Sequence, residues 1–187
     1  TGAGNTAVGY RALATNTGSF NGTAVGAQAL ANATGAGNIA VGAFSGFNVT
    51  TGQANILIGN AGVAAESNTI RLGDANQNRA FISGIRGVTT GAANAIAVFV
   101  DSNGQLGTAS SSRRVKDDIA DLGDTSEVLM SLRPVSFRYK SHVASGVDEP
   151  QVGFIAEEVA EVAPYLAVRA TDGSIETVKY HFLAPML

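Results

Sequence analysis

The first 75 residues repeat a short pattern of small, apolar and glycine residues. Each repeat has a three-residue, mostly apolar run followed by Gly, and then turns rich in Ala, Asn, Thr and Gly. The repeats are NTAVG at 5–9, GTAVG at 22–26, NIAVG at 38–42, NILIG at 55–59 and TIRLG at 69–73, so the period is 14 to 17 residues. A unit this short cannot bury its own apolar face. The pattern therefore predicts short strands stacked in a parallel β-solenoid.

The side chains within the repeats are small, which has two consequences. Ala7, Ala24 and Ala40 allow neighbouring backbones to approach closely. Large apolar residues are scarce, so lateral association of several copies is expected to supply the missing core. A flexible linker is the alternative interpretation, but linkers do not keep Val, Ile or Leu in register before Gly five times.

These repeats resemble the head domains of trimeric autotransporter adhesins and the similar heads of phage tail fibres. The resemblance covers residues 1–74 and implies a trimeric, left-handed parallel β-roll. Residues 75–110 break the period but remain rich in β-branched residues. Within this connector, DSNG between AVFV and QLGT predicts a hairpin over residues 96–109, because Asn-Gly supplies the positive φ that a tight turn needs.

Residues 111–187 show a different pattern, that of a small α+β domain. DTSEVLMSLRP predicts a two-turn helix with Asp124 as N-cap, and the alternation in VSFRYK predicts a strand. VGFIAEEVAEVAP predicts a strand that leads into an acidic helix, and LAVRATDGSIETVKY predicts a hairpin around Asp172-Gly173. YHFLAPML is expected to open a further helix that the given chain cuts off.

Composition separates the same two parts. Residues 1–110 hold 19 of the 23 glycines and seven charged side chains (4 − 3 = +1), whereas residues 111–187 hold all four prolines and 20 charges (8 − 12 = −4). The acidic balance argues against nucleic acid as a partner, and no apolar stretch approaches the roughly 20 residues of a membrane span. With no cysteine and only two distant histidines, His142 and His181, neither a metal site nor a cofactor is expected.

The candidate chemistry lies at the junction of the two parts, in GTASSSRRVKDDI. Ser111 precedes Lys116 by five residues. Taken alone, this spacing favours a solvated polar linker, because Ser and Lys occur at such offsets in most proteins. Any chemistry here has to use hydroxyl, amine or carboxylate groups.

The surrounding motifs change this interpretation. SSRRVKDDI, LRPVSFRYK, VGFIAEEV and VKYHFLAPML occur in the order and approximate spacing of the intramolecular chaperone domain of phage endosialidases and tail spikes, a self-cleaving Ser-Lys peptidase family. The resemblance spans residues 111–187. It implies Ser111 as nucleophile and Lys116 as base, with cleavage between Ser110 and Ser111. Arg113 and Arg114 are the supporting residues, and Ser112 stands where the family pattern usually has Asp.

The resemblance implies the C-terminal part of a homotrimeric surface or tail fibre. Its last domain promotes trimer assembly and then releases itself in a single autoproteolytic turnover. The alternative is a non-catalytic trimeric adhesin or receptor-binding tip whose C-terminal domain is a permanent clamp. Either protein is expected outside the cell, on a bacterial surface or a phage virion, where it meets a host-cell or prey receptor or glycan.

Two other groups of residues have weaker signals. Glu157 and Glu158 resemble the paired carboxylates of a glycosidase, but adjacent helical residues point about 100° apart, which favours a solvated acidic helix. Four charged residues of the repeats and connector are expected either to form salt bridges between chains or to lie on a solvated face. They are Arg71, Asp74, Arg79 and Arg86.

Overall fold

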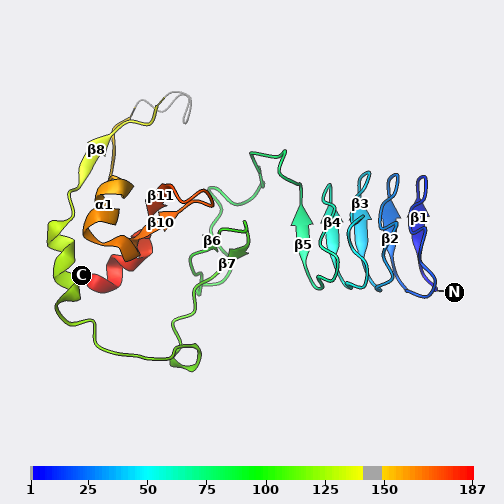
Figure 1. The fold of residues 1–187 in the computed structure, drawn as a ribbon, viewed down its shortest axis with the longest axis horizontal. Coiled ribbons are helices and arrows are strands. Elements are labelled where there is room, and N and C mark those ends of the chain that lie inside the picture. The colour runs from blue at the N-terminus through cyan, green and yellow to red at the C-terminus, as the bar shows by residue number, and fades with distance from the viewer. Residues whose placement is uncertain (1, 141–148) are drawn as a thin grey trace. The chain divides into compact units, whose positions relative to one another are not determined.

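The computed structural model describes residues 2–140 and 149–187 of the chain (Figure 1). The chain divides into two compact units, residues 1–89 and 90–187, and each is described by itself below. The division falls inside the predicted connector at residues 75–110. His142 lies outside the described residues.

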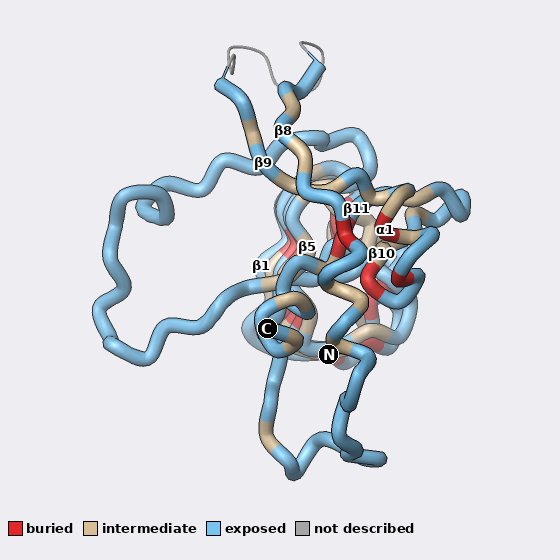
Figure 2. The backbone as a smooth tube through the Cα atoms, turned by 90° about the vertical axis from the view of Figure 1, so that its left-hand side faces the viewer, coloured by how far each residue is buried: buried red, intermediate tan, exposed pale blue. Residues whose placement is uncertain are grey.

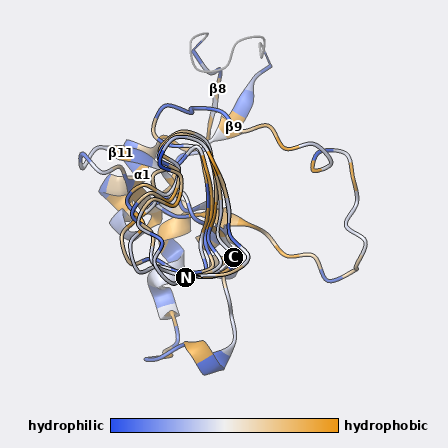
Figure 3. Ribbon diagram, turned by 90° about the vertical axis from the view of Figure 1, so that its right-hand side faces the viewer, coloured by the Kyte–Doolittle hydropathy of each residue, from blue (hydrophilic) through white to orange (hydrophobic). Residues whose placement is uncertain are grey.

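The first unit is a parallel β-solenoid, and the predicted fold class is confirmed. Its sheet has the order β1-β2-β3-β4-β5, with every neighbouring pair parallel. Seen along the stack, the coils lie one behind another (Figure 3). The pairing keeps the repeats in register, so that Ala7 pairs with Ala24 and Ala24 with Ala40. The strands are β1 (Thr6–Val8), β2 (Thr23–Val25), β3 (Ile39–Val41), β4 (Ile56–Ile58) and β5 (Ile70–Leu72).

The middle residue of each strand points into the coil and its neighbours point outward, as the two-residue period of a strand requires. Ala24, Ala40 and Leu57 are fully buried, together with Leu30 and Val49 from the turns. Figure 2 colours the backbone by burial, with the buried segments in red. The last residue of every strand is exposed. These residues form a row along the sheet, here called the outer ridge: Val8, Val25, Val41, Ile58 and Leu72.

The glycine after each strand has a positive φ, and after β1 and β2 the close approach of the next coil also requires it. Gly26 has φ of 134°, and a Cβ placed on it would lie 2.5 Å from the carbonyl oxygen of Gly42 in the next coil. No side chain fits at that distance. The repeated apolar-Gly pair is therefore a stacking requirement as well as a turn signal.

The asparagines that precede three of the strands form an asparagine ladder, defined as Asn5, Asn38 and Asn55. The Asn38 side chain is buried, donates to the carbonyls of Gly35 (3.0 Å) and Gly52 (2.8 Å), and accepts from the backbone N–H and Nδ2 of Asn55 (3.0 and 3.1 Å). Asn55 in turn accepts from the N–H of Thr69. Each amide thus satisfies backbone groups of neighbouring coils that the strands leave unpaired.

An ion pair closes the last coil. In β5 the inward position holds Arg71, whose Nε lies 2.9 Å from both carboxylate oxygens of Glu66, and Glu66 also accepts from the N–H of Val63. The Glu66 side chain is only 12% exposed. The Arg71 guanidinium is the main cause that lowers the pKa of Glu66. Arg71 therefore pairs within its own chain, whereas the sequence predicted a pair between chains or a solvated face.

The described residues of the second unit form three two-stranded antiparallel sheets and short helices. β6 (Phe99–Val100) pairs with β7 (Leu106–Gly107), which confirms the predicted hairpin around DSNG. The remaining elements are η1 (Arg113–Val115), η2 (Gly123–Ser131), β8 (Val135–Phe137), β9 (Gln151–Gly153), α1 (Ala156–Val162), η3 (Pro164–Leu166), β10 (Ala167–Arg169), β11 (Ile175–Val178), η4 (Tyr180–Phe182) and η5 (Ala184–Met186).

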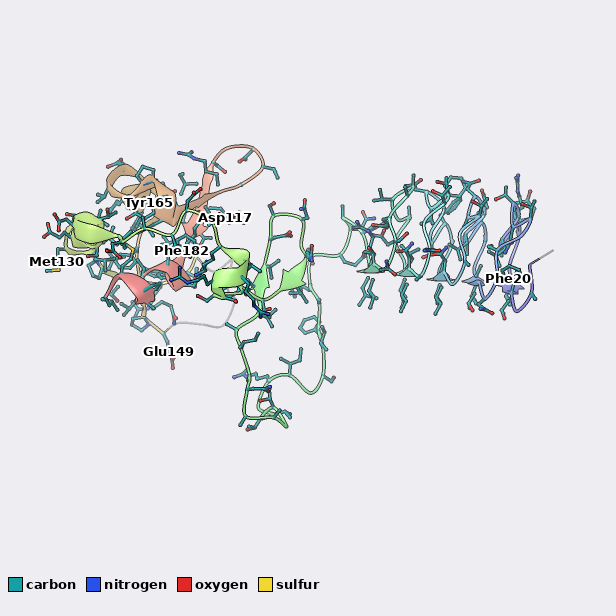
Figure 4. All side chains as sticks on the ribbon, turned by 90° about the horizontal axis from the view of Figure 1, so that it is seen from below. Phe20, Asp117, Met130, Glu149, Tyr165 and Phe182 are labelled. Atoms are coloured by element: carbon teal, nitrogen blue, oxygen red, sulfur yellow. The ribbon has the colours of Figure 1, made fainter. Side chains whose placement is uncertain are left out.

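The core of the second unit is small and local. It consists of buried residues from η2, α1, η3 and β11, and partly buried residues such as Phe154 and Leu183 pack against it. Many large apolar side chains remain outside this core. Met130, labelled in Figure 4, is 90% exposed. The buried members are Leu132, Val159, Ala163, Leu166 and Val178.

Two helix predictions in this unit are wrong in detail. The predicted α-helix at DTSEVLMS is the 3-10 helix η2, whose N-cap is Leu122, so Asp124 lies in its first turn and caps nothing. β-branched and hydroxyl residues in this stretch disfavour a regular α-helix. The predicted final helix is two 3-10 turns, η4 and η5, because Pro185 lacks the N–H that a continuing helix uses.

Candidate active site

The candidate active site is a tight turn built from consecutive residues. Ser112 is the N-cap of η1, with extended backbone angles (φ −67°, ψ 136°), and its carbonyl accepts from the N–H of Val115 (3.1 Å). The N–H of Lys116 then donates to the carbonyl of Arg113 (3.3 Å). The chain therefore makes one 3-10 turn between Ser111 and Lys116, which brings residues five apart in sequence to the same side of the turn.

The turn brings the two predicted catalytic side chains together. Lys116 Nζ donates a hydrogen bond to Ser111 Oγ over 3.0 Å. This distance is within the reach over which a base takes a proton from a hydroxyl nucleophile. The five-residue offset, which carries no information alone, thus corresponds to a contact once the intervening residues form a 3-10 turn.

The supporting arginines are placed differently from each other. Arg114 Nε donates to Ser112 Oγ (3.3 Å), and its backbone N–H donates to the same oxygen (3.4 Å). Arg113 contributes its backbone carbonyl to the turn. Both arginines belong to the turn that carries Lys116, so two positively charged side chains lie close to its amine in the sequence.

The dyad of Ser111 and Lys116 is exposed in the single chain. The apolar residues that follow it are exposed too: Val115 is 66%, Ile119 53% and Leu122 50% exposed. Asp117, the next residue after Lys116, is labelled in Figure 4. A lysine serves as a base only when its amine is neutral, which requires an apolar site or nearby positive charge. The geometry of a nucleophile and base is therefore present, while the dry surroundings that activate a lysine are not.

The two glutamates considered as glycosidase carboxylates, Glu157 and Glu158, lie in the first turn of α1. Glu158, in the first turn of α1, forms an ion pair with Arg133, whose Nε lies 3.0 Å from Oε2, and this partner lowers the pKa of Glu158. Glu157 is its neighbour on the exposed side of the same turn. A carboxyl held ionised by an arginine is a poor proton donor. Glu158 is therefore poorly suited to be the general acid of a glycosidase.

Sequence analysis missed a contact between the hairpin and the end of the chain. The rings of Phe99, in β6, and His181, in η4, lie 4.7 Å apart, and His181 also contacts Phe182. Tyr180, also in η4, accepts a hydrogen bond from the N–H of Phe154 (3.1 Å). Nothing in the repeat or in the junction motif signals these pairings.

Residues 2–140 and 149–187 contain no group of three His, Cys, Asp or Glu side chains arranged to hold a metal ion. Among the helices within these residues, none has the length and apolar character needed to cross a membrane.

Comparison with known proteins identifies the domain that follows the junction. Residues 111–167 match the family described as chaperone of endosialidase, and the match begins at Ser111. No curated protein and no solved structure matches the chain. The resemblance of the first 74 residues to adhesin heads stays a prediction, while their β-solenoid fold is seen directly. Over residues 111–167 the chain carries a domain that matches the endosialidase-chaperone family.

Proposed function

We propose that the chain is the C-terminal part of a homotrimeric fibre whose last domain assembles the trimer and then releases itself by cutting between Ser110 and Ser111. The hydrogen bond of 3.0 Å between Lys116 Nζ and Ser111 Oγ, at the first residues of the family match, carries this proposal. The fibre is displayed outside the cell, on a virion or a bacterial surface, where it binds a receptor or glycan.

The reaction is an acyl shift followed by hydrolysis. Ser111 Oγ forms a bond to the carbonyl carbon of Ser110 while its proton passes to neutral Lys116. The peptide bond between the two serines then breaks, and Lys116 returns the proton to the departing nitrogen. Water finally hydrolyses the ester, leaving a carboxylate on Ser110 and the free hydroxyl on Ser111. Because the attacking group and the target belong to consecutive residues, the step needs no second reactant.

Assembly switches this reaction on. Lys116 has to lose water before it becomes neutral, and the exposed flank of Val115, Ile119 and Leu122 offers an apolar surface for a neighbouring chain. When a second copy covers this flank, it removes water from the Lys116 amine. The positive charges of Arg113 and Arg114 then also disfavour the protonated form of this amine. A free chain keeps its amine in water and stays uncut. The cut thereby reports a completed trimer.

The solenoid supplies the second argument for a trimer. The outer ridge is apolar at every coil, and its exposed fractions run from 37% for Val25 to 68% for Leu72. A continuous apolar row of this kind on a stable protein marks a surface that another protein covers. Each coil of one chain is already paired with its neighbours, so none is left to cover the outer ridge. The same ridge on further copies of the chain covers it best.

The decisive experiment follows self-cleavage of the purified whole chain by mass spectrometry. Intact chains have a mass of 18.9 kDa, and a cut gives two pieces that add up to this mass plus one water, the second beginning Ser-Ser-Arg-Arg. Ser111→Ala and Lys116→Ala are each expected to abolish the cut. Lys116→Arg is expected to abolish it too, because a guanidinium stays protonated at any usable pH.

Matched controls separate chemistry from folding. Ser102→Ala and Lys140→Ala replace exposed residues of the same types away from the dyad, and both are expected to cut at the wild-type rate. A wild-type chain that forms trimers and stays intact indicates the permanent clamp instead. If Lys116→Ala cuts at the wild-type rate, the dyad is refuted even though the chaperone role survives.

The trimer itself is tested by light scattering on the Ser111→Ala chain. Val41→Asp places a charge in the middle of the outer ridge and is expected to give monomers or aggregates. Gln53→Asp places the same charge in an exposed turn and is expected to leave the trimer unchanged. A folded, stable monomer of the parent chain contradicts both the trimer and the assembly switch.

A further inference from the structure

Ser112 makes hydrogen bonds in the turn that the contact between Ser111 and Lys116 does not require. Its Oγ accepts from the backbone N–H of Arg114 (3.4 Å) and from Arg114 Nε (3.3 Å), so its side chain caps η1. Its backbone N–H donates to Ser110 Oγ (3.4 Å). Ser112 therefore connects the residue before the cut with the turn after it.

The capped turn is the only element that links Ser111 to Lys116 among the contacts described around them. Its two backbone hydrogen bonds, from Val115 to Ser112 and from Lys116 to Arg113, determine where the lysine side chain begins. A turn of three residues is marginal in water, because few hydrogen bonds offset the entropy of ordering it. An N-cap oxygen satisfies one of its open N–H groups and favours the turn over extended chain.

We propose that Ser112 is a positioning residue for self-cleavage: by capping η1 it raises the fraction of chains in which Lys116 lies within hydrogen-bond reach of Ser111. This proposal rests on the proposed self-cleavage. Ser112 touches neither the attacked carbonyl nor the lysine amine in the described contacts, and it acts through the turn. The sequence marks Ser112 only as a departure from the Asp that the family pattern usually has, and it assigns Ser112 no role in cutting.

The test measures the first-order rate constant of cutting in preassembled trimers of the whole chain. Ser112→Ala removes the cap and is expected to slow cutting about 3- to 10-fold, the fold-change that corresponds to losing an N-cap. Ser112→Thr restores a capping hydroxyl without adding charge and is expected to recover most of the rate. The pH at which the rate is half maximal is expected to stay the same in all three proteins, because the lysine and its surroundings are unchanged.

Controls distinguish this role from a general effect on folding. Trimer content by light scattering is expected to be equal for wild type, Ser112→Ala and Ser112→Thr, and Ser102→Ala is expected to cut normally. Ser112→Ala cutting at the wild-type rate overturns the positioning role while the dyad stands. Equal slowing by Ala and Thr also overturns it, since a capping hydroxyl then makes no difference. A wild-type chain that never cuts overturns the proposed function and the positioning role together.

Discussion

Removing one rung of the asparagine ladder is expected to loosen the middle of the solenoid. Asn38→Ala deletes a side chain that makes four hydrogen bonds, two as donor to the carbonyls of Gly35 and Gly52 and two as acceptor from Asn55. The residue is 1% exposed, so water has little access to replace these bonds. The backbone groups left behind are the carbonyls of Gly35 and Gly52 and the N–H of Asn55, on two neighbouring coils.

The size of the effect follows from these four bonds. Each hydrogen bond contributes about 0.5–1.5 kcal/mol net, so the loss is about 4 kcal/mol per chain. Asn48→Ala is the matched control, because its exposed Nδ2 makes one long bond, 3.3 Å, to the carbonyl of Gly62. This control is expected to cost less than about 1 kcal/mol.

Hydrogen exchange followed by mass spectrometry measures the loss of stability of the two variants in the coils around Asn38. The Ser111→Ala chain keeps every molecule covalently intact, and peptides from residues 35–58 contain both affected coils. Asn38→Ala is expected to speed the slowest exchange in these peptides by roughly a hundred- to a thousandfold, since about 1.4 kcal/mol corresponds to a factor of ten. Asn48→Ala is expected to change it less than about fivefold. Equal exchange in the two variants would falsify the claim that the ladder holds the coils together.

Three further outcomes are expected. Glu66→Gln is expected to destabilise the solenoid at pH 7 and much less at low pH. Arg71 lowers the pKa of Glu66, so the contribution of the carboxylate to stability is present above that pKa and is lost as the pH falls through it. Thermal unfolding at pH 7 and pH 3 measures the difference, and an equal loss at both would contradict the ion pair's role. Gly26→Ala puts a Cβ 2.5 Å from a carbonyl of the next coil and is expected to abolish folding of the solenoid, seen as loss of its strand signal in circular dichroism, whereas retained signal means the coils can separate there. After complete cutting, the two pieces are expected to separate in size-exclusion chromatography, because the ring contact between Phe99 and His181 is worth only about 1 kcal/mol; co-elution implies a larger interface.

The solenoid was predictable because its signal repeats. Five apolar-Gly runs at nearly constant spacing leave few folds that bury them, and small residues at inward positions such as Ala24 and Ala40 agree with close stacking. The ion pair of Glu66 and Arg71 was missed, because it occurs once, at the end of the repeat, where the pattern that carries the prediction stops. Short 3-10 helices in the second unit were also missed, because their length is set by local competition between weak propensities.

The candidate site was predictable in its residues and only partly in its geometry. The motif SSRRVK names Ser111 and Lys116 through a family resemblance, and the match that begins at Ser111 supports that domain. The capping by Ser112 depends on backbone angles that no spacing rule contains. The contact of Phe99 with His181 joins residues 82 positions apart, and such pairings follow from the packing of the whole unit.

The site separates two requirements of a self-cutting protein. Its geometry is local, because seven consecutive residues from Ser110 to Lys116 form the turn and the contact between nucleophile and base. Its activation is collective under the proposal, because only neighbouring chains can take water away from an amine that each chain leaves exposed. Under the proposed function, a chain carries its cutting machinery ready-made and idle during synthesis and folding. Once such chains assemble and cut, the solenoid loses the domain that brought them together, and unfolding then has to be reversed from three separate chains. The proposed fibre is held by that barrier and needs no larger equilibrium stability.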